Sequence, residues 1–174
     1  YLIEEKHVPA YQIMAITFTN KAAHEMRERV NRIVSFGAEQ VWVSTFHSSC
    51  VRILRRYADR IGYGNNFTIY DSDDSKTLMK AIIKKLNLDT KMFKERSLLS
   101  AISAAKNEMI SQEQFRKDAG SDWKLQKIAD AYDEYQSQLQ ANNAMDFDDL
   151  LVNAVELFLQ CPEVLESYQD RLRY

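Results

Sequence analysis

Two Thr-Phe pairs stand where an apolar, β-branched run gives way to an amphipathic helix pattern. Thr17-Phe18 ends one such run, and Thr45-Phe46 ends the next. A helix start offers free backbone N–H groups, and threonine hydroxyls beside them can bind phosphate oxygens. A neighbouring phenylalanine can stack on any nucleobase, which is worth about 1–3 kcal/mol per base. The pattern therefore predicts a site for a single nucleic-acid strand with little sequence preference.

A structural alternative stays open for both phenylalanines, because either ring can fill the core beneath the sheet edge. The first corner also lacks the glycines with which nucleotide-binding turns let the backbone approach a pyrophosphate. The pattern alone therefore leaves the ligand of the corner open.

Two further groups could carry chemistry. His47 and Cys50 lie three positions apart on an expected helix, as a base and a nucleophile can; a buried cysteine beside a polar residue is the simpler interpretation. Asp146, Asp148 and Asp149 could bind a divalent cation through oxygen. Because acidic residues also gather at helix N-termini, helix capping explains these three aspartates more simply.

The composition is typical of a soluble globular domain. The 174 residues are 45% hydrophobic and 28% charged, and only 4 Gly and 2 Pro favour helices over long linkers. No apolar run reaches the about 18 residues of a membrane span, and no signal segment opens the chain. Cys50 and Cys161 lack metal-ligand spacing and indicate reduced thiols, so we expect a cytoplasmic protein.

Charge is distributed unevenly, although the net charge is only −2. Residues 1–75 are balanced, residues 76–128 carry 12 basic and 6 acidic side chains, and residues 129–174 carry 2 basic and 10 acidic ones. A basic middle segment indicates an anionic partner for that part of the chain. A solvated lysine surface without a partner would give the same totals, so charge alone does not decide.

Residues 13–18 and 41–45 predict buried strands, each followed by a helix. Thr19 or Asn20 can cap the first helix, which is expected to end near Gly37. The order strand–helix–strand–helix is typical of a parallel sheet. The carboxyl edge of such a sheet is where open α/β proteins bind their ligands, and both Thr-Phe corners are expected there.

The rest of the chain predicts a helical insertion and a return to the first layer. Residues 62–143 are expected to be mainly helical, with one short extended piece near residues 67–71. After them, a helix capped by Asp146 and a last helix beginning at Pro162 lead toward another strand at Tyr174. Within the insertion we expect four helices. The first is capped by Asp73 or Asp74, the second spans residues 93–109, a short third begins with a capping box at Ser111, and the fourth spans residues 124–140.

Four ordered segments resemble the superfamily 1 DNA helicases of the UvrD/Rep/PcrA family. AITFTNKAAHEMRERV (residues 15–30) resembles motif Ia of that family, and VSTFHSSCVRILRR (residues 43–56) resembles motif Ib. ISAAKNE (residues 102–108) and MDFDDLL (residues 145–151) resemble two further segments. The resemblance covers essentially the whole chain and is closest to the PcrA branch.

The resemblance implies an α/β fold with a mainly helical insertion. A partial RecA-like (P-loop NTPase) parallel sheet, domain 1A, would comprise residues 1–61 and 144–174, and an all-helical domain 1B would comprise residues 62–143. The family's enzymes are ATP-driven translocases that move 3′ to 5′ along one DNA strand and unwind the duplex ahead. Single-stranded and duplex DNA are therefore the expected partners, with no membrane involved.

Two DNA-contacting corners carry over from the family. Phe18 matches the motif Ia phenylalanine, whose surroundings form a pocket for an unpaired base. The resemblance assigns to the first corner Thr17, Phe18, Thr19, Asn20 and Lys21, and to the second Thr45, Phe46 and His47. The positive charge of the middle segment adds three possible contacts to the DNA backbone, namely Lys84, Lys85 and Lys106.

The family's two ATP motifs do not occur in these residues. No G-x-x-x-x-G-K-[ST] loop is present for the ATP phosphates, and no Asp-Glu pair follows a strand to hold Mg²⁺. In the family these motifs lie shortly before the position of Tyr1 and just beyond Tyr174, so we expect a piece of a longer chain. ATP and Mg²⁺ are expected in the parent protein. No cofactor, metal ion or catalytic residue is expected in this fragment, which should be inactive alone.

Two other functions remain open at this point. The chain could be the helicase part of a helicase–nuclease, which uses related motifs, or a helical protein-interaction module whose basic surface binds an acidic partner. A parallel sheet that lacks some of its strands also exposes edges and apolar faces, so self-association of the fragment is expected.

Overall fold

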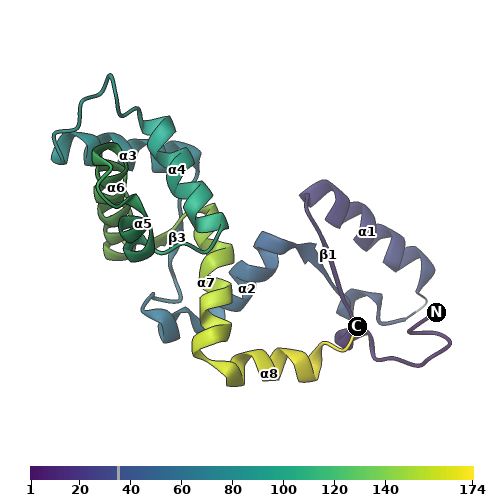
Figure 1. Cartoon of the computed structure of the whole chain (residues 1–174). Coiled ribbons are helices and arrows are strands. Elements are labelled where there is room, and N and C mark those ends of the chain that lie inside the picture. The colour runs from purple at the N-terminus through teal and green to yellow at the C-terminus, as the bar shows by residue number, and fades with distance from the viewer. Residues whose placement is uncertain (35) are drawn as a thin grey trace.

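The computed structural model describes residues 1–34 and 36–174, a helix-rich α/β chain with two small parallel sheets in the described part (Figure 1). The strands are β1 (Met14–Thr17), β2 (Trp42–Thr45), β3 (Thr68–Ile69) and β4 (Ala144–Met145). The α-helices are α1 (Asn20–Ile33), α2 (Phe46–Tyr57), α3 (Ser72–Lys85), α4 (Glu95–Asn107), α5 (Gln112–Ala119), α6 (Trp123–Ala141), α7 (Phe147–Gln160) and α8 (Pro162–Arg171). Short 3-10 turns are η1 (Ala10–Gln12), η2 (Ala38–Gln40) and η3 (Ala58–Ile61).

β1 and β2 pair in parallel, which confirms the predicted order of strands and helices. The register places Met14 opposite Trp42 and Thr17 opposite Thr45, so the strands end side by side. Because α1 and α2 begin close behind these strand ends, both corners leave the sheet at one carboxyl edge (Figure 1).

Threonine hydroxyls start both helices at this edge. Oγ1 of Thr19 accepts a hydrogen bond from the Ala22 N–H (3.1 Å), and Oγ1 of Thr45 accepts one from the Ser48 N–H (3.2 Å). Each bond satisfies a backbone donor that the helix itself leaves unpaired. The threonines therefore set the direction in which each helix leaves its strand.

The predicted end of the first helix near Gly37 is wrong, because α1 ends at Ile33. The Val34 N–H still bonds the Val30 carbonyl, and Val34 itself is extended. Gly37 adopts a left-handed conformation with φ of 81° and starts the turn η2. Its freedom from a Cβ thus serves the turn before β2 and not the helix terminus.

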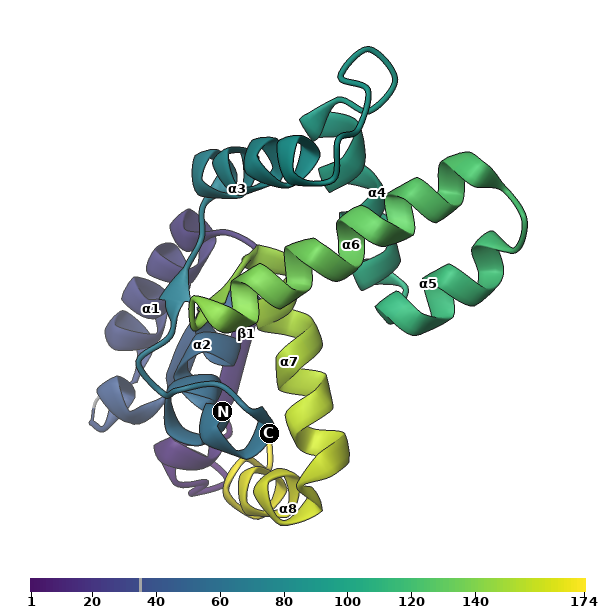
Figure 2. The same ribbon diagram turned by 90° about the vertical axis from the view of Figure 1, so that its left-hand side faces the viewer.

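Helices α3 to α6 lie together in Figure 2, and we call them the helical lobe. One cluster of buried side chains lies among α3, α4 and α6. Apolar residues from α3, α4 and α6 meet there at helical spacing, which is what stabilises an insertion of this size. Among the most deeply buried are Met79, Ile82, Leu98, Ile102, Tyr135 and Leu139.

The cap of α3 is Asp71, and the predicted caps Asp73 and Asp74 lie in the first turn instead. Oδ1 of Asp71 accepts the N–H groups of both residues, at 2.8 and 2.9 Å, and the Asp74 carboxylate accepts the Asp71 N–H at 3.1 Å. This capping box explains why the sequence pattern placed the start too late: several acidic residues favour the same helix end.

The chain enters and leaves the helical lobe through the sheet of β3 and β4. Thr68 pairs with Ala144, and Ile69 pairs with Met145. The expected extended piece near residues 67–71 is confirmed as β3, which is rich in β-branched residues. Ala144 and Met145 of β4 are not β-branched, so no sequence signal marks this strand.

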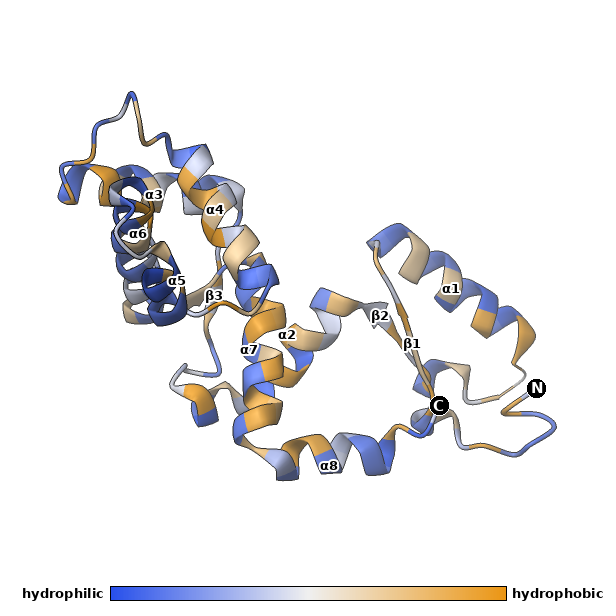
Figure 3. Cartoon of the chain, viewed as in Figure 1, coloured by the Kyte–Doolittle hydropathy of each residue, from blue (hydrophilic) through white to orange (hydrophobic). Residues whose placement is uncertain are grey.

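A second buried cluster lies between α2, α7 and α8 and includes Trp42 of β2. Figure 3 shows apolar residues concentrated along α7, which packs against α2. Asp146 caps α7 and Pro162 opens α8, as the sequence predicts. Together with the first sheet and α1, these helices form what we call the sheet lobe.

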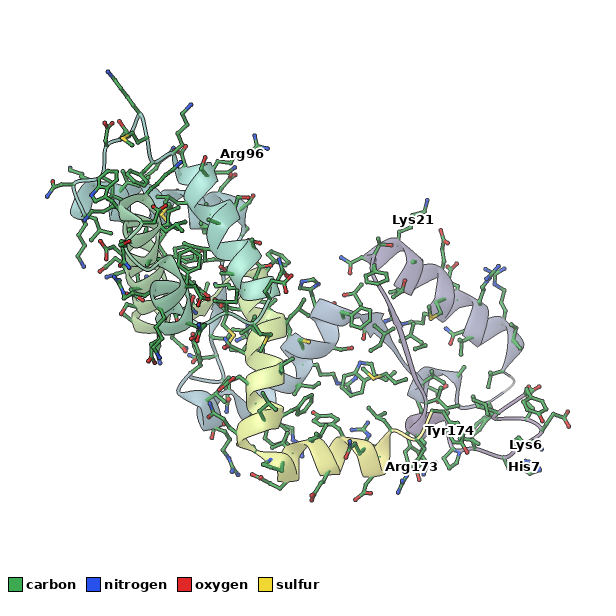
Figure 4. All side chains as sticks on the ribbon, in the orientation of Figure 1. Lys6, His7, Lys21, Arg96, Arg173 and Tyr174 are labelled. Atoms are coloured by element: carbon green, nitrogen blue, oxygen red, sulfur yellow. The ribbon has the colours of Figure 1, made fainter. Side chains whose placement is uncertain are left out.

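The end of the chain returns to the first sheet. The Met14 N–H donates a 2.8 Å hydrogen bond to the Tyr174 carbonyl, and Tyr174 lies beside the start of β1 (Figure 4). The expectation that Tyr174 leads toward another strand stays a prediction. Of the helices that the structure describes, none is long and apolar enough to cross a bilayer.

Candidate nucleic-acid interface

Phe18 and Phe46 form an exposed aromatic pair at the shared sheet edge. Their ring centroids lie 5.2 Å apart, with the planes tilted by 35°. Phe18 is 85% exposed and Phe46 is 42% exposed, so the core-filling alternative is wrong for both rings. Exposed aromatic rings in mutual contact offer flat apolar surfaces on which a base can stack.

A second aromatic contact continues from this pair. His47 follows Phe46 in the chain, and its ring centroid lies 5.8 Å from that of Phe147 at the start of α7. Phe147 is 53% exposed. Four rings thus form two contacting pairs, Phe18–Phe46 and His47–Phe147, which are linked in the chain where Phe46 precedes His47. We call these four residues the aromatic row.

Phe147 was not among the residues that the sequence indicated. It lies three positions before Leu150 and seven before Ala154, both buried, so its spacing places it on the apolar face of α7. Phe147 differs from the buried residues of that face only in being the first residue of α7, directly after the cap, where its side chain is exposed to solvent.

The polar residues of the two corners have different surroundings. Thr19, Asn20 and Lys21 are exposed, and Thr17 is half-buried. Thr45 is only 5% exposed, and its hydroxyl caps α2 and donates to Ser48 Oγ at 2.9 Å. We therefore assign Thr45 a role in shaping the second corner and no direct contact with a ligand.

Positive charge borders the aromatic row. Lys21 projects from the first turn of α1, and Arg96 projects from α4 on the same side of the molecule (Figure 4). Lys21 makes one long contact with Glu25 at 4.0 Å, and both side chains are exposed, so the lysine charge is little neutralised. Arg96, Lys76 and Phe147 line a cavity of about 290 Å³ between α3, α4 and the start of α7.

The two lysines predicted near the end of α3 are accessible. Lys84 is exposed and lines a surface cavity of about 520 Å³ together with Lys80 and Phe93. The Nζ of Lys85 pairs with Glu134 Oε1 of α6 at 2.6 Å but stays largely exposed. Both side chains are free to approach a polyanion.

Lys106 is different, and its predicted contact with the DNA backbone does not fit the structure. The residue is 3% exposed, and its Nζ lies 2.8 Å from both Asp146 Oδ2 and Asp149 Oδ1. The charge total of the middle segment could not reveal this, because a count does not distinguish a buried lysine from a solvated one. We leave Lys106 out of the interface.

Comparison with known proteins identifies the family of this chain. Residues 1–174 match the family model described as the UvrD/REP helicase N-terminal domain. The chain belongs to this family. It is 52% identical over 174 residues to the ATP-dependent DNA helicase PcrA of Bacillus subtilis (strain 168), 51% to that of Staphylococcus aureus (strain Mu50 / ATCC 700699) and 50% to that of Staphylococcus epidermidis (strain ATCC 35984).

These alignments cover all of this chain but only 23% of the Bacillus subtilis protein and 24% of each staphylococcal one. The chain therefore spans about a quarter of the length of the curated relatives that it matches. The family match confirms the resemblance to the UvrD/Rep/PcrA helicases.

In this UvrD/REP-type domain the other candidate groups have structural roles. Burial raises the pKa of the Cys50 thiol, which disfavours the thiolate that a nucleophile needs. Asp146 and Asp149 form the capping box of α7 and pair with Lys106. Across the residues described, no group of three or more acidic, His or Cys side chains could hold a metal ion.

Proposed function

We propose that this chain is part of an ATP-dependent DNA helicase and holds unpaired DNA at the carboxyl edge of its first sheet. The names of the similar PcrA proteins support the enzyme class. The observation that carries the DNA site is the register of β1 and β2. Because Thr17 lies opposite Thr45, the residues after them, Phe18 and Phe46, meet as an exposed pair.

The proposed binding mode combines stacking with phosphate contacts. Bases would stack on Phe18 and Phe46 and then along His47 and Phe147, and exposed groups such as Asn20 and the Lys21 ammonium would meet the phosphates. None of these groups selects a base edge, so binding would tolerate any sequence. That tolerance suits a motor that must pass along arbitrary DNA.

The helical lobe would be domain 1B and the sheet lobe part of domain 1A, with translocation 3′ to 5′ as in the family. Two separate buried clusters support this division, as does the β3–β4 sheet where the chain passes between the lobes. Lys84 and Lys85, at the end of α3, are the candidates for contacts with duplex DNA.

ATP and Mg²⁺ would bind to other parts of the parent protein, because the residues present here do not fit them. None of the four glycines, Gly37, Gly62, Gly64 and Gly120, lies between a strand and the α-helix that follows it. The strand-to-helix corners instead carry Phe18 and Phe46, whose bulk would prevent close approach of a pyrophosphate. We propose that the fragment alone does not hydrolyse ATP.

Replacing Phe18 by alanine should weaken binding of a labelled oligothymidylate, measured by fluorescence anisotropy. Loss of one stacked base corresponds to about 1–3 kcal/mol, or roughly 5- to 150-fold in Kd. Phe36→Ala is the matched control, because Phe36 is equally exposed but lies outside the aromatic row. Equal affinities of the Phe18 and Phe36 variants would contradict the proposed site.

The same titration at several salt concentrations tests the phosphate contacts. Affinity should fall as salt rises, because each neutralised phosphate releases condensed counterions. Affinity that does not depend on salt, or a Phe18→Ala/His47→Ala variant that binds like the unmodified chain, would favour the protein-interaction alternative.

A further inference from the structure

The buried ammonium of Lys106 ties the end of α4 to the start of α7. Lys106 lies in the last turn of α4, and its two partners, Asp146 and Asp149, are the cap and a first-turn residue of α7. The cation thus lies at the negative end of one helix dipole and the carboxylates at the positive end of another. Both dipoles favour the charges found there.

Each carboxylate divides its oxygens between α7 and the helical lobe. Oδ1 of Asp146 accepts the Asp149 N–H at 2.9 Å, and Oδ2 of Asp149 accepts the Asp146 N–H at 3.1 Å. The remaining oxygens face Lys106, and they also accept the Tyr135 hydroxyl and the Gln136 amide of α6, each at 3.1 Å. The cap of α7 is therefore oriented by α4 and α6 together.

Phe147 lies between the two capping aspartates in the chain. Its backbone position follows from where the cap is held, and its ring reaches His47 of α2. A shift of the first turn of α7 would move Phe147 away from His47. The charged cluster, which joins Lys106 of the helical lobe to Asp146 and Asp149 of α7, is thus one residue away in the chain from Phe147 of the aromatic row.

We propose that Lys106 is a positioning residue, whose ion pairs hold the first turn of α7 so that Phe147 lies against His47 at the DNA-binding corner. A buried ion cluster is weak evidence for a stabilising role, since apolar replacements of similar volume are often as stable. What such a cluster can supply is a defined arrangement of the elements that it joins. Here it joins the helical lobe to the aromatic row.

The test compares Lys106→Met with Lys117→Met in the 174-residue chain. Lys117 is an exposed lysine on α5, paired with Glu113 at 2.7 Å, so its replacement makes the same change in charge away from α7. The first readout is the nuclear Overhauser effect between the His47 and Phe147 rings. We expect Lys106→Met to lose it and Lys117→Met to keep it.

The second readout is the affinity for oligothymidylate, combined in a double-mutant cycle with Phe147→Ala. Lys106→Met should lower the affinity at least about fivefold, the effect of one weakened stacking contact. If Lys106 acts through Phe147, adding Phe147→Ala to Lys106→Met should cause little further loss. Fully additive losses would overturn the positioning role.

Folding is checked by circular dichroism, because Lys106→Met leaves two buried carboxylates unpaired. If that variant does not fold, the charge-free variant Lys106→Met/Asp146→Asn/Asp149→Asn takes its place, since asparagine also caps helices well. We expect the same loss of the ring contact in it. A folded variant of either kind that keeps the ring contact overturns the positioning role.

The role of Lys106 rests on the DNA-binding function proposed above. The two readouts therefore distinguish failure of that function from failure of the positioning role. An unmodified chain without affinity for oligothymidylate would overturn the proposed function, while the ring contact would still test Lys106. An unmodified chain that binds, together with a Lys106→Met variant that binds equally well and keeps the contact, would overturn only the positioning role.

Discussion

For single residues, the sequence predicts the place in a strand or helix better than it predicts whether the side chain is buried. Phe18 and Phe46 could be found because each follows a strand pattern directly, yet only the structure shows that their rings face solvent. Lys106 carries one clue: it lies four positions after the buried Ile102 and directly after the buried Ala105, on the inner face of α4. That spacing predicts a buried lysine, whereas the count of charges over residues 76–128 does not distinguish Lys106 from the exposed lysines.

Thr45 provides the residue-scale prediction. Its hydroxyl caps α2, so Thr45→Val should lower the free energy of unfolding by about 1 kcal/mol, the usual effect of losing such a cap. Thr45→Ser keeps the hydroxyl and should lose much less. Urea denaturation of both variants checks this, and a loss for Thr45→Ser as large as that for Thr45→Val would contradict the dominant role of the cap.

At the scale of elements, strong periodic patterns predict helices and strands correctly. A two-residue strand and a helix start with several candidate caps are not predicted correctly. The parallel pairing of β1 and β2 and the starts of α7 and α8 follow from the sequence. The two-residue strand β4 is not predicted from the sequence, because it forms by pairing with β3, which is distant in the chain. The start of α3 was misplaced because three nearby aspartates satisfy the same local rule.

The capping box of α3 gives the element-scale prediction. Hydrogen bonds from the backbone of Asp74 and Asp73 lower the pKa of Asp71, so its contribution to stability is present above the ordinary value and lost as pH falls. Asp71→Ala should lower the melting temperature at neutral pH more than Asp73→Ala does. The difference between the two variants should vanish in acid, as thermal melts at several pH values would show.

At the scale of the whole molecule, two buried clusters share one chain, and buried titratable groups make its stability sensitive to alkali. Burial raises the pKa of Tyr132 to about 12. Burial alone would lower the pKa of Lys106, but the charges of Asp149 and Asp146 outweigh it and raise the value. Both folded-state values exceed the unfolded ones, so the stability they contribute is complete at neutral pH and lost as pH rises through them.

Unfolding in urea at increasing pH measures this loss. The free energy of unfolding should stay level to about pH 10 and then decline toward pH 12. Tyr132→Phe removes the titrating hydroxyl and should make the decline shallower, although it also removes the hydrogen bond from that hydroxyl to the Ile110 carbonyl. A flat profile to pH 12 would contradict the prediction.

One apolar surface of the sheet lobe is open to solvent. A cavity of about 310 Å³ lies beside β1, bordered by α2, α7 and α8, and Met14, Ile16, Phe46, Phe158 and Leu172 are among its walls. Apolar surface of this kind promotes association between molecules. The expected self-association of the fragment remains a proposal, which light scattering can test.

The matched ends of β1 and β2 also decide where this chain tolerates a change in length. A strand advances about 3.3 Å per residue and alternates its faces, so a residue inserted into β1 or β2 would carry one corner past the other and invert the side chains beyond it. The turn η2 lies outside the ladder of paired residues and can absorb an insertion without separating Phe18 from Phe46. Relatives can therefore differ in length at η2 while the two strands keep their residue count.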